Sequence, residues 1–215
     1  ADDGAINDGF GRSVAISDKT ILVGSPRNDD LGADSGSAYV YAFNNNVWNQ
    51  EEKLGANDGA GDDQFGGAVD IDGDRAVISA YQADAPQQDS GAVYVFMKKD
   101  NRWTHQSKLT PEGPAVGDNF GWSVAISKDR IAVGARFGDL GGSQSWTGYL
   151  FAAGAQGTWH IRQDFNGNDT GQDDEFGSSI ALDGTSVVVG VPKHDGTADN
   201  AGAAYLFDGT KSVCT

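Results

Sequence analysis

Aspartate residues recur at fixed distances before a repeated Phe-Gly dipeptide, and this spacing makes them the first candidates for metal chemistry. One lies two positions before each of the four dipeptides, and another lies seven positions before three of them: Asp8, Asp63, Asp118 and Asp174, then Asp3, Asp58 and Asp169. Calcium takes about six to eight oxygen ligands, which aspartate-rich loops supply. Aspartate at such positions also forms Asx turns that start a strand. Two hypotheses therefore stand side by side: bound calcium, and a turn that needs no metal.

A second set of candidates consists of aromatic and cationic residues that break the repeat. Trp122 directly follows the third Phe-Gly, and Trp146 lies in a later loop of the same unit. Tyr81 and Arg136 occupy a position that is proline in the other two units. Because Trp, Tyr and Arg dominate binding hot spots, these four residues predict a patch for a sugar ring or a peptide side chain. The alternative is that both tryptophans only fill space left by local loop changes.

Groups that would indicate catalysis are sparse. The three histidines are His105, His160 and His194, and the sequence has no nucleophile elbow, zinc-protease helix or phosphate-binding glycine loop. Paired carboxylates could act as in a glycosidase, but a catalytic acid needs a desolvated pocket that raises its pKa. The aspartates of this chain are instead expected in exposed loops. The sequence therefore argues against an enzyme.

The elements that position these residues follow from the repeat itself. The Phe-Gly dipeptides begin at residues 10, 65, 120 and 176, at steps of 55, 55 and 56 residues. Each is followed by two short apolar runs, a glycine-led aromatic run and, in three units, a run that contains tryptophan. Short runs rich in Val, Ile, Tyr and Phe, separated by Gly, Asp and Asn, predict strands. Four antiparallel strands per unit form one blade of a β-propeller.

The units resemble FG-GAP repeats, the blade type of integrin α-subunit propellers. Besides Phe-Gly, the second signature element appears as Gly24-Ser25-Pro26 and Gly190-Val191-Pro192, and the middle two units depart from it. The resemblance implies an all-β propeller of four FG-GAP-type blades and an extracellular or secreted recognition module, in its mature form, with a role in adhesion at the cell surface. The family's usual calcium loop lies between the first two strands of a blade. Here that turn is too short, as at Asp72-Gly73-Asp74.

The repeat also predicts the domain organisation. We expect a single domain over residues 1–215, with blades at about 1–54, 55–109, 110–165 and 166–215. The two ends of the sequence fall at nearly equivalent points of the repeat. This arrangement favours a closed ring of four blades, because no residues are left over; part of a larger propeller is the alternative.

Charge limits the class of partner. The net charge is −16, from 31 acidic and 15 basic residues. Nucleic acid and anionic membrane surfaces require clustered Lys and Arg, and no apolar run approaches the roughly 20 residues that cross a bilayer. Most aspartates fall in loops that a four-stranded meander places on one edge of the propeller. We therefore expect a protein or glycan ligand at this acidic edge, with calcium assisting; the alternative is a scaffold subunit of a larger assembly.

Overall fold

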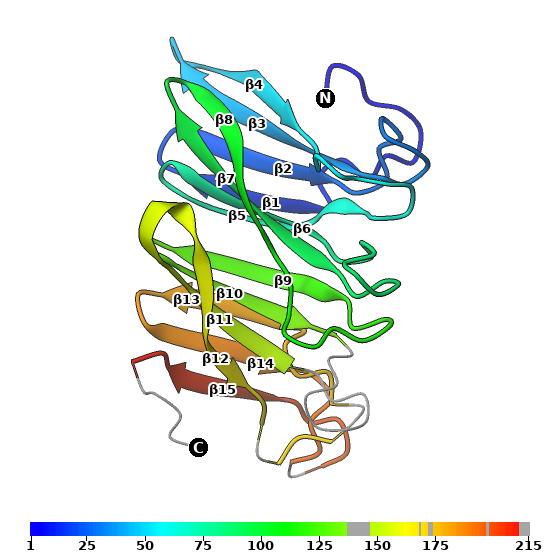
Figure 1. Ribbon diagram of the computed structural model, residues 1–215, viewed down its shortest axis with the longest axis vertical. Coiled ribbons are helices and arrows are strands. Elements are labelled where there is room, and N and C mark those ends of the chain that lie inside the picture. Colours follow the sequence, from blue (N-terminus) through cyan, green and yellow to red (C-terminus); the bar gives the residue numbers. More distant parts are fainter. Residues whose placement is uncertain (137–146, 168, 172–173, 197, 211–215) are drawn as a thin grey trace.

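The computed structural model describes residues 1–136, 147–167, 169–171, 174–196 and 198–210. Within these residues the chain forms four antiparallel sheets, and each sheet contains strands in their order along the sequence. The sheets follow one another from one end of the molecule to the other, with the β1 sheet at one end and β15 at the opposite end (Figure 1). This is the blade arrangement of a β-propeller, as the repeat predicts.

Strand bounds repeat closely from blade to blade. Blade 1 contains β1 (Ser13–Ser17), β2 (Thr20–Ser25), β3 (Ser37–Asn44) and β4 (Val47–Leu54). Blade 2 contains β5 (Phe65–Asp72), β6 (Arg75–Ala80), β7 (Ala92–Lys99) and β8 (Arg102–Leu109). Blade 3 contains β9 (Phe120–Ser127), β10 (Arg130–Ala135), β11 (Thr147–Ala153) and β12 (Trp159–Phe165), with the short 3₁₀ turn η1 (Ala155–Gly157) before β12. Blade 4 contains β13 (Ser179–Asp183), β14 (Ser186–Val191) and β15 (Ala203–Asp208).

The turn between the first two strands of each blade contains only two residues. In blade 1 the pairing of Ser17 with Thr20 leaves Asp18 and Lys19 in the turn, and Asp18 has a φ of 49°. Two-residue hairpins favour positive φ because their backbone twist then matches that of the strands. A turn of this length cannot contain the family's calcium loop, as the sequence indicates.

None of the helical segments in the described residues has the length and hydropathy of a membrane span.

The Phe-Gly dipeptide forms the contact between one blade and the next. The Phe65 N–H donates to the Ser35 carbonyl at 3.0 Å, and the Phe120 N–H donates to the Ser90 carbonyl at 2.9 Å. A Cβ atom on Gly36, in the preceding blade, would lie 2.1 Å from the Phe65 oxygen. The backbones therefore approach so closely that the preceding blade must have glycine at this point.

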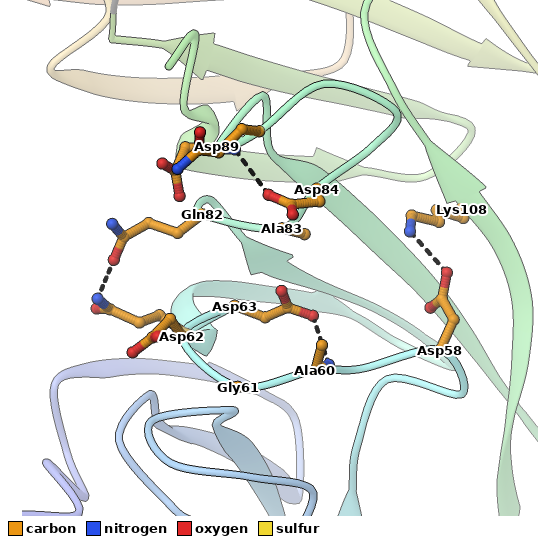
Figure 2. Close-up of a pocket in the computed structure, with 12 residues that line it drawn as sticks. Asp58, Ala60, Gly61, Asp62, Asp63, Gln82, Ala83, Asp84, Asp89 and Lys108 are labelled. Carbon is orange, nitrogen blue, oxygen red and sulfur yellow. Dashed lines mark hydrogen bonds and ion pairs between the residues drawn. The ribbon is translucent and has the colours of Figure 1, made fainter. Parts of the chain in front are cut away.

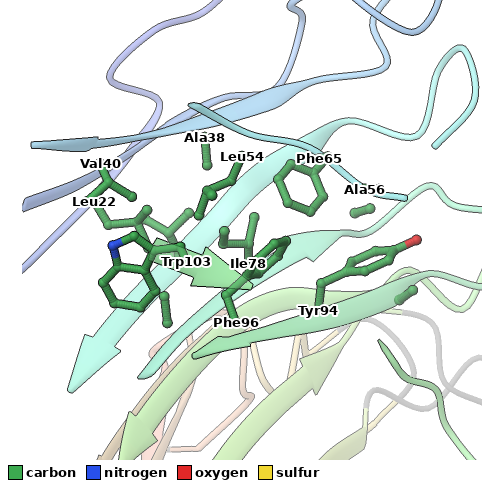
Figure 3. Packing of buried hydrophobic residues seen from close by; sticks show 14 of the residues in the cluster. Leu22, Ala38, Val40, Leu54, Ala56, Phe65, Ile78, Tyr94, Phe96 and Trp103 are labelled. Carbon is green, nitrogen blue, oxygen red and sulfur yellow. The ribbon is translucent and has the colours of Figure 1, made fainter. Parts of the chain in front are cut away.

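The hydrophobic core consists of layers between successive blades. We call the face of a blade that contacts the preceding blade its front face, and the opposite face its back face. Figure 3 shows the first layer, in which Leu22 and Val40 on the back face of blade 1 pack with Ile78 and Phe96 on the front face of blade 2. Equivalent layers lie between blades 2 and 3 and between blades 3 and 4. A blade thus needs a neighbour on each face to bury its apolar side chains.

The described blades form an open arc. On the front face of blade 1, Val14 is 66% exposed and Ile16 is 65% exposed, whereas the equivalent Val69 and Ile71 of blade 2 are buried. On the back face of blade 4, Leu206 is 73% exposed. Both terminal faces therefore lack the neighbour that covers every internal face. The sequence left two arrangements open. The structure does not show the closed ring of four blades, because the faces of blades 1 and 4 do not cover each other.

The loops that contain most aspartates lie on one edge of the arc. The Asp62 N–H donates to the Ala33 carbonyl, and the Gln64 N–H donates to the Asp34 carbonyl. These bonds join the loop before the first strand of blade 2 to the loop between the second and third strands of blade 1. We call the edge formed by these two classes of loop the loop edge. The arrangement agrees with the one expected for a meander.

Candidate functional site

An acidic pocket of about 560 Å³ opens on the loop edge of blade 2 (Figure 2). It lies between residues 58–64, which precede β5, and residues 82–89, which follow β6. The charged residues that line it are five aspartates and one lysine: Asp58, Asp62, Asp63, Asp84, Asp89 and Lys108. The pocket therefore has a strongly negative lining, in keeping with the net charge of −16 of the chain.

The aspartate two positions before each Phe-Gly closes a local turn. The Asp63 Oδ2 accepts the N–H of Ala60 at 2.8 Å, and the equivalent bond recurs in every blade. All four of these side chains are buried: Asp8, Asp63, Asp118 and Asp174. Burial raises the pKa of Asp63, although the bond from Ala60 partly opposes this effect. Each bond comes from the residue three positions earlier, so it closes a turn without metal, although it is not the Asx turn to the residue two positions further on.

The aspartate seven positions before Phe-Gly is held by side chains from distant strands. The Tyr94 hydroxyl of β7 donates to Asp58 at 2.8 Å, and the Lys108 ammonium of β8 lies 2.7 Å from the same carboxylate. Burial alone would raise the pKa of Asp58, but the bonds from Lys108 and Tyr94 lower it below the ordinary value. Asp3 has the same contacts with Tyr39 and Lys53, and Asp169 accepts the Tyr205 hydroxyl.

These arrangements account for the aspartates without a calcium ion. In the described part of the chain, no three His, Cys, Asp or Glu side chains are grouped so as to hold a metal. The seven aspartates named from the sequence are divided between two tasks, the turn and the tyrosine contact. A lysine ammonium next to Asp3 and Asp58 also opposes a second cation at those positions. Bound calcium stays a prediction, and the function proposed below does not depend on it.

Chelation provides a direct test of the calcium hypothesis. We expect excess EDTA to leave the melting temperature of the protein unchanged, because backbone N–H, tyrosine and lysine donors already satisfy the aspartates. Differential scanning calorimetry with and without EDTA measures this. A metal present at a hundredfold over its dissociation constant would contribute about 2.7 kcal/mol, so a clear fall in melting temperature would contradict the expectation.

Three of the four residues assigned to the aromatic patch lie together. The Tyr81 and Trp122 rings meet edge to face with centroids 5.2 Å apart, and the Arg136 guanidinium lies 4.4 Å from the Trp122 ring. Trp146 lies outside the described residues. Trp122 and Tyr81 also line a cavity of about 380 Å³ that is bordered by residues at the start of the first strand of all four blades. The inner strands thus curve around a common axis.

Some residues of the acidic pocket were not singled out from the sequence. Gln64 and Gln82 line it and bond to each other across the pocket, and Gln64 also accepts the Tyr81 hydroxyl. Lys108 enters it from β8, 50 residues after Asp58. In the sequence, the role of Lys108 is indicated only by its equivalence to Lys53 in the repeat. Their contact with aspartate depends on the distance between strands, which the spacing does not reveal.

Comparison with known proteins finds a repeat family, a relative and a solved structure that are similar to this chain. The sequence profile of the FG-GAP repeat matches four segments, residues 1–41, 48–96, 103–151 and 159–207. Integrin alpha-6 of Gallus gallus is 30% identical over 130 residues, which make up 56% of this chain and 12% of that protein. The crystal structure of Saccharomyces cerevisiae Sqt1 has a similar fold, with a TM-score of 0.56 at 9% identity. The similarity covers 97% of this chain and 48% of that chain.

Proposed function

The chain belongs to the FG-GAP repeat family, and on that premise we propose that it is a non-catalytic extracellular module that recognises a basic segment of a partner protein. The propeller fits an integrin-like binding or scaffold module. Within this class, the acidic pocket of blade 2 is the observation that favours recognition. Its position on the loop edge leaves it accessible to a macromolecular partner.

The chemistry of the pocket favours a cationic side chain. Asp62 and Asp84 are exposed at its rim, while Asp63 is buried at its wall. Lys108 is the one basic residue of the lining, and it is paired with Asp58. A lysine or arginine of a partner would therefore enter a region of negative potential, which increases the rate of encounter as well as the affinity.

The same geometry argues against catalysis at this site. A catalytic carboxylic acid needs a raised pKa together with access to substrate. Asp63 has a raised pKa, but its side chain is buried and bonded to the N–H of Ala60. Asp58 has a lowered pKa, so at neutral pH it remains a carboxylate. Binding is the function that these groups support.

A glycan ligand remains a prediction. The cavity lined by Trp122 and Tyr81 has the size of a small-molecule site, about 300–1,000 Å³. However, Trp122 already contacts Arg136 and Tyr81 within the chain. Stacking of a sugar on the indole would compete with the Arg136 contact. For this reason we favour the acidic pocket.

Titration with a tetralysine peptide tests the proposed recognition. We expect saturable binding by calorimetry that weakens as salt is added, because exposed charges are screened. Asp62→Asn and Asp84→Asn should each weaken binding about twofold to fivefold, the range for one exposed ion pair. The amide of Asp84→Asn retains an oxygen that can accept the Asp89 N–H, so the loop should keep its shape.

The matched control is Asp74→Asn, in the two-residue turn between β5 and β6 on the opposite edge. Asp74 is exposed like Asp62, so its removal changes the net charge equally. We expect this variant to bind tetralysine within error of the wild type, and tetraglutamate to bind none of the proteins. Equal weakening in all three variants would show that only the net charge matters, and would contradict a site at the pocket.

A further inference from the structure

Blade 3 has an aspartate at a position where blades 1 and 2 each have a lysine beside a buried tyrosine. We infer that blade 3 binds the ammonium group of a lysine side chain from a partner protein, against the ring of Tyr149 and beside Asp164. The inference rests on the proposed recognition of a basic partner, but its site is separate from the acidic pocket of blade 2. Blade 3 packs against blade 2 on one face and blade 4 on the other, so the uncovered ends of the arc have no part in this site.

In blades 1 and 2, a lysine of the chain itself supplies the ammonium. The Lys108 ammonium lies 2.7 Å from the Asp58 carboxylate and 5.2 Å from the centre of the Tyr94 ring. In blade 1, the Lys53 ammonium lies at the same 5.2 Å from the centre of the Tyr39 ring. An ammonium over an aromatic face is attracted by the negative charge of the ring face. The repeat therefore forms the same ammonium site twice.

Blade 3 keeps the tyrosine but reverses the charge beside it. Tyr149 on β11 lies opposite Asp164 on β12, and the equivalent pair of blade 2 is Tyr94 and Lys108. The residue seven positions before Phe-Gly is Gly113, in place of an aspartate. No salt bridge of the described residues includes Asp164. Blade 3 thus has an anion and an aromatic ring where blades 1 and 2 have a complete ion pair.

The Tyr149 hydroxyl points to the same place as its equivalents but has no hydrogen bond in the described part of the chain. The Tyr149 ring meets Phe120 edge to face with centroids 5.4 Å apart, and Tyr94 meets Phe65 at the same distance. Three equivalent hydroxyls donate to aspartates: those of Tyr39, Tyr94 and Tyr205. Tyr149 is only 3% exposed, and a buried hydroxyl without a partner costs free energy. A bound ammonium would donate an N–H to this oxygen.

The charges around this tyrosine are negative. Burial raises the pKa of Tyr149 above its ordinary value, and nearby carboxylates raise it further: those of Asp118, Asp164 and Glu112. The hydroxyl therefore stays protonated at neutral pH. The same negative charges that oppose ionisation of the phenol favour the approach of a cation.

The chemistry of the site favours an ammonium over a metal ion. Calcium requires about six to eight oxygen ligands, and no three His, Cys, Asp or Glu side chains of the described residues are grouped so as to hold a metal. An ammonium has three N–H donors, so one carboxylate, one hydroxyl and an aromatic face suit it. Lysine is also the residue that fills the equivalent place in blades 1 and 2.

Titration with Nα-acetyl-lysine methylamide, followed by amide NMR, tests the site. We expect saturable shifts at Tyr149 and Asp164, and none with the norleucine analogue, which lacks the ammonium. Shifts confined to the blade 2 pocket, as at Asp84, would overturn this inference and leave the proposed function standing; shifts confined to blade 3 would do the reverse. Calcium chloride that produces the same shifts at a lower concentration would show a metal site and would overturn the ammonium.

Replacing Asp164 tests the charge. Asp164→Asn should weaken binding of the lysine probe about twofold to fivefold. Asp164→Lys should weaken it about tenfold or more, because the new ammonium would lie over Tyr149 as Lys108 lies over the tyrosine of blade 2. The control is Asp74→Lys on the opposite edge, which changes the net charge equally and should bind as the wild type does. Equal weakening by both lysine variants would contradict a local site.

Removing one hydroxyl at a time provides a readout that does not depend on the probe. Tyr94→Phe should lower the melting temperature by about 2–4 °C, because it removes the bond to Asp58. Tyr149→Phe removes no such bond, so the melting temperature should not fall, while binding of the lysine probe should weaken about twofold to tenfold. A fall for Tyr149→Phe as large as that for Tyr94→Phe would show that the hydroxyl is already bonded within the chain, and would overturn the inference.

Discussion

Replacing Gly36 with alanine should destabilise the protein by about 3 kcal/mol or more and lower its melting temperature by about 6–12 °C. Gly36 has a φ of 84°, which any other L-residue adopts only with strain. The new Cβ atom would also lie 2.1 Å from the Phe65 oxygen and 2.4 Å from its nitrogen. Both are backbone atoms of the next blade, so the two sheets must move apart. Urea denaturation monitored by tryptophan fluorescence measures the loss.

Gly117→Ala is the matched control for this substitution. Gly117 has a φ of 82°, so it carries nearly the same conformational strain, but a Cβ atom there would meet nothing within 4 Å. We expect Gly117→Ala to cost only about 1–2 kcal/mol. The difference between the two variants isolates the contact between blades. Equal losses in both would show that the strain of the backbone alone requires glycine.

Phe120→Ala should cost about 3–5 kcal/mol in the free energy of unfolding, the range for a fully buried phenylalanine. Phe120 has no exposed surface, and its ring packs edge to face against Tyr149 and Phe151 at 5.4 and 5.9 Å between centroids. Alanine would leave a cavity in the layer between blades 2 and 3. Thermal and urea unfolding of the variant provide two independent measurements.

Phe10→Ala is the control, because Phe10 occupies the same position of the repeat in blade 1 and is 44% exposed. Because less of the Phe10 ring is buried, we expect this substitution to cost clearly less than Phe120→Ala. The comparison therefore separates the role of the motif within a blade from its role between blades. A loss for Phe10→Ala as large as that for Phe120→Ala would mean that the ring stabilises its own blade and not the junction.

Much of the fold is visible in the sequence because it depends on local patterns. The β-branched runs predict strands, and two-residue turns such as Asp18-Lys19 pair neighbouring strands. The repeated spacing then predicts that the strands form equivalent blades. The repeat also places the aspartates on a common edge, because a meander alternates direction with each strand. These inferences need only the order of the residues along the chain.

The contacts of the candidate site depend on distances that spacing does not contain. Asp58 meets Tyr94 and Lys108 across 36 and 50 residues, and these contacts place it beside an ammonium group. The sequence alone left calcium and a turn as alternatives for Asp63, whereas the structure shows its bond to the Ala60 N–H. The repeat does predict that Trp122, Tyr81 and Arg136 share one edge of the propeller, and in the structure they are in contact.

By itself, the sequence determined the family, the all-β class, the number of blades and the acidic character of one edge. All of these follow from the types of residue and from their spacing, which recur in the four repeats. Only the tertiary structure decided that the blades form an open arc, because closure depends on the angle between successive blades. It also decided what each repeated aspartate contacts. Phe10 and Phe120 are both followed by Gly-x-Ser-Val-Ala-Ile in the sequence, but Phe10 is 44% exposed and Phe120 is buried. The physical reason is that burial is set by the blade in front, which Phe120 has and Phe10 lacks.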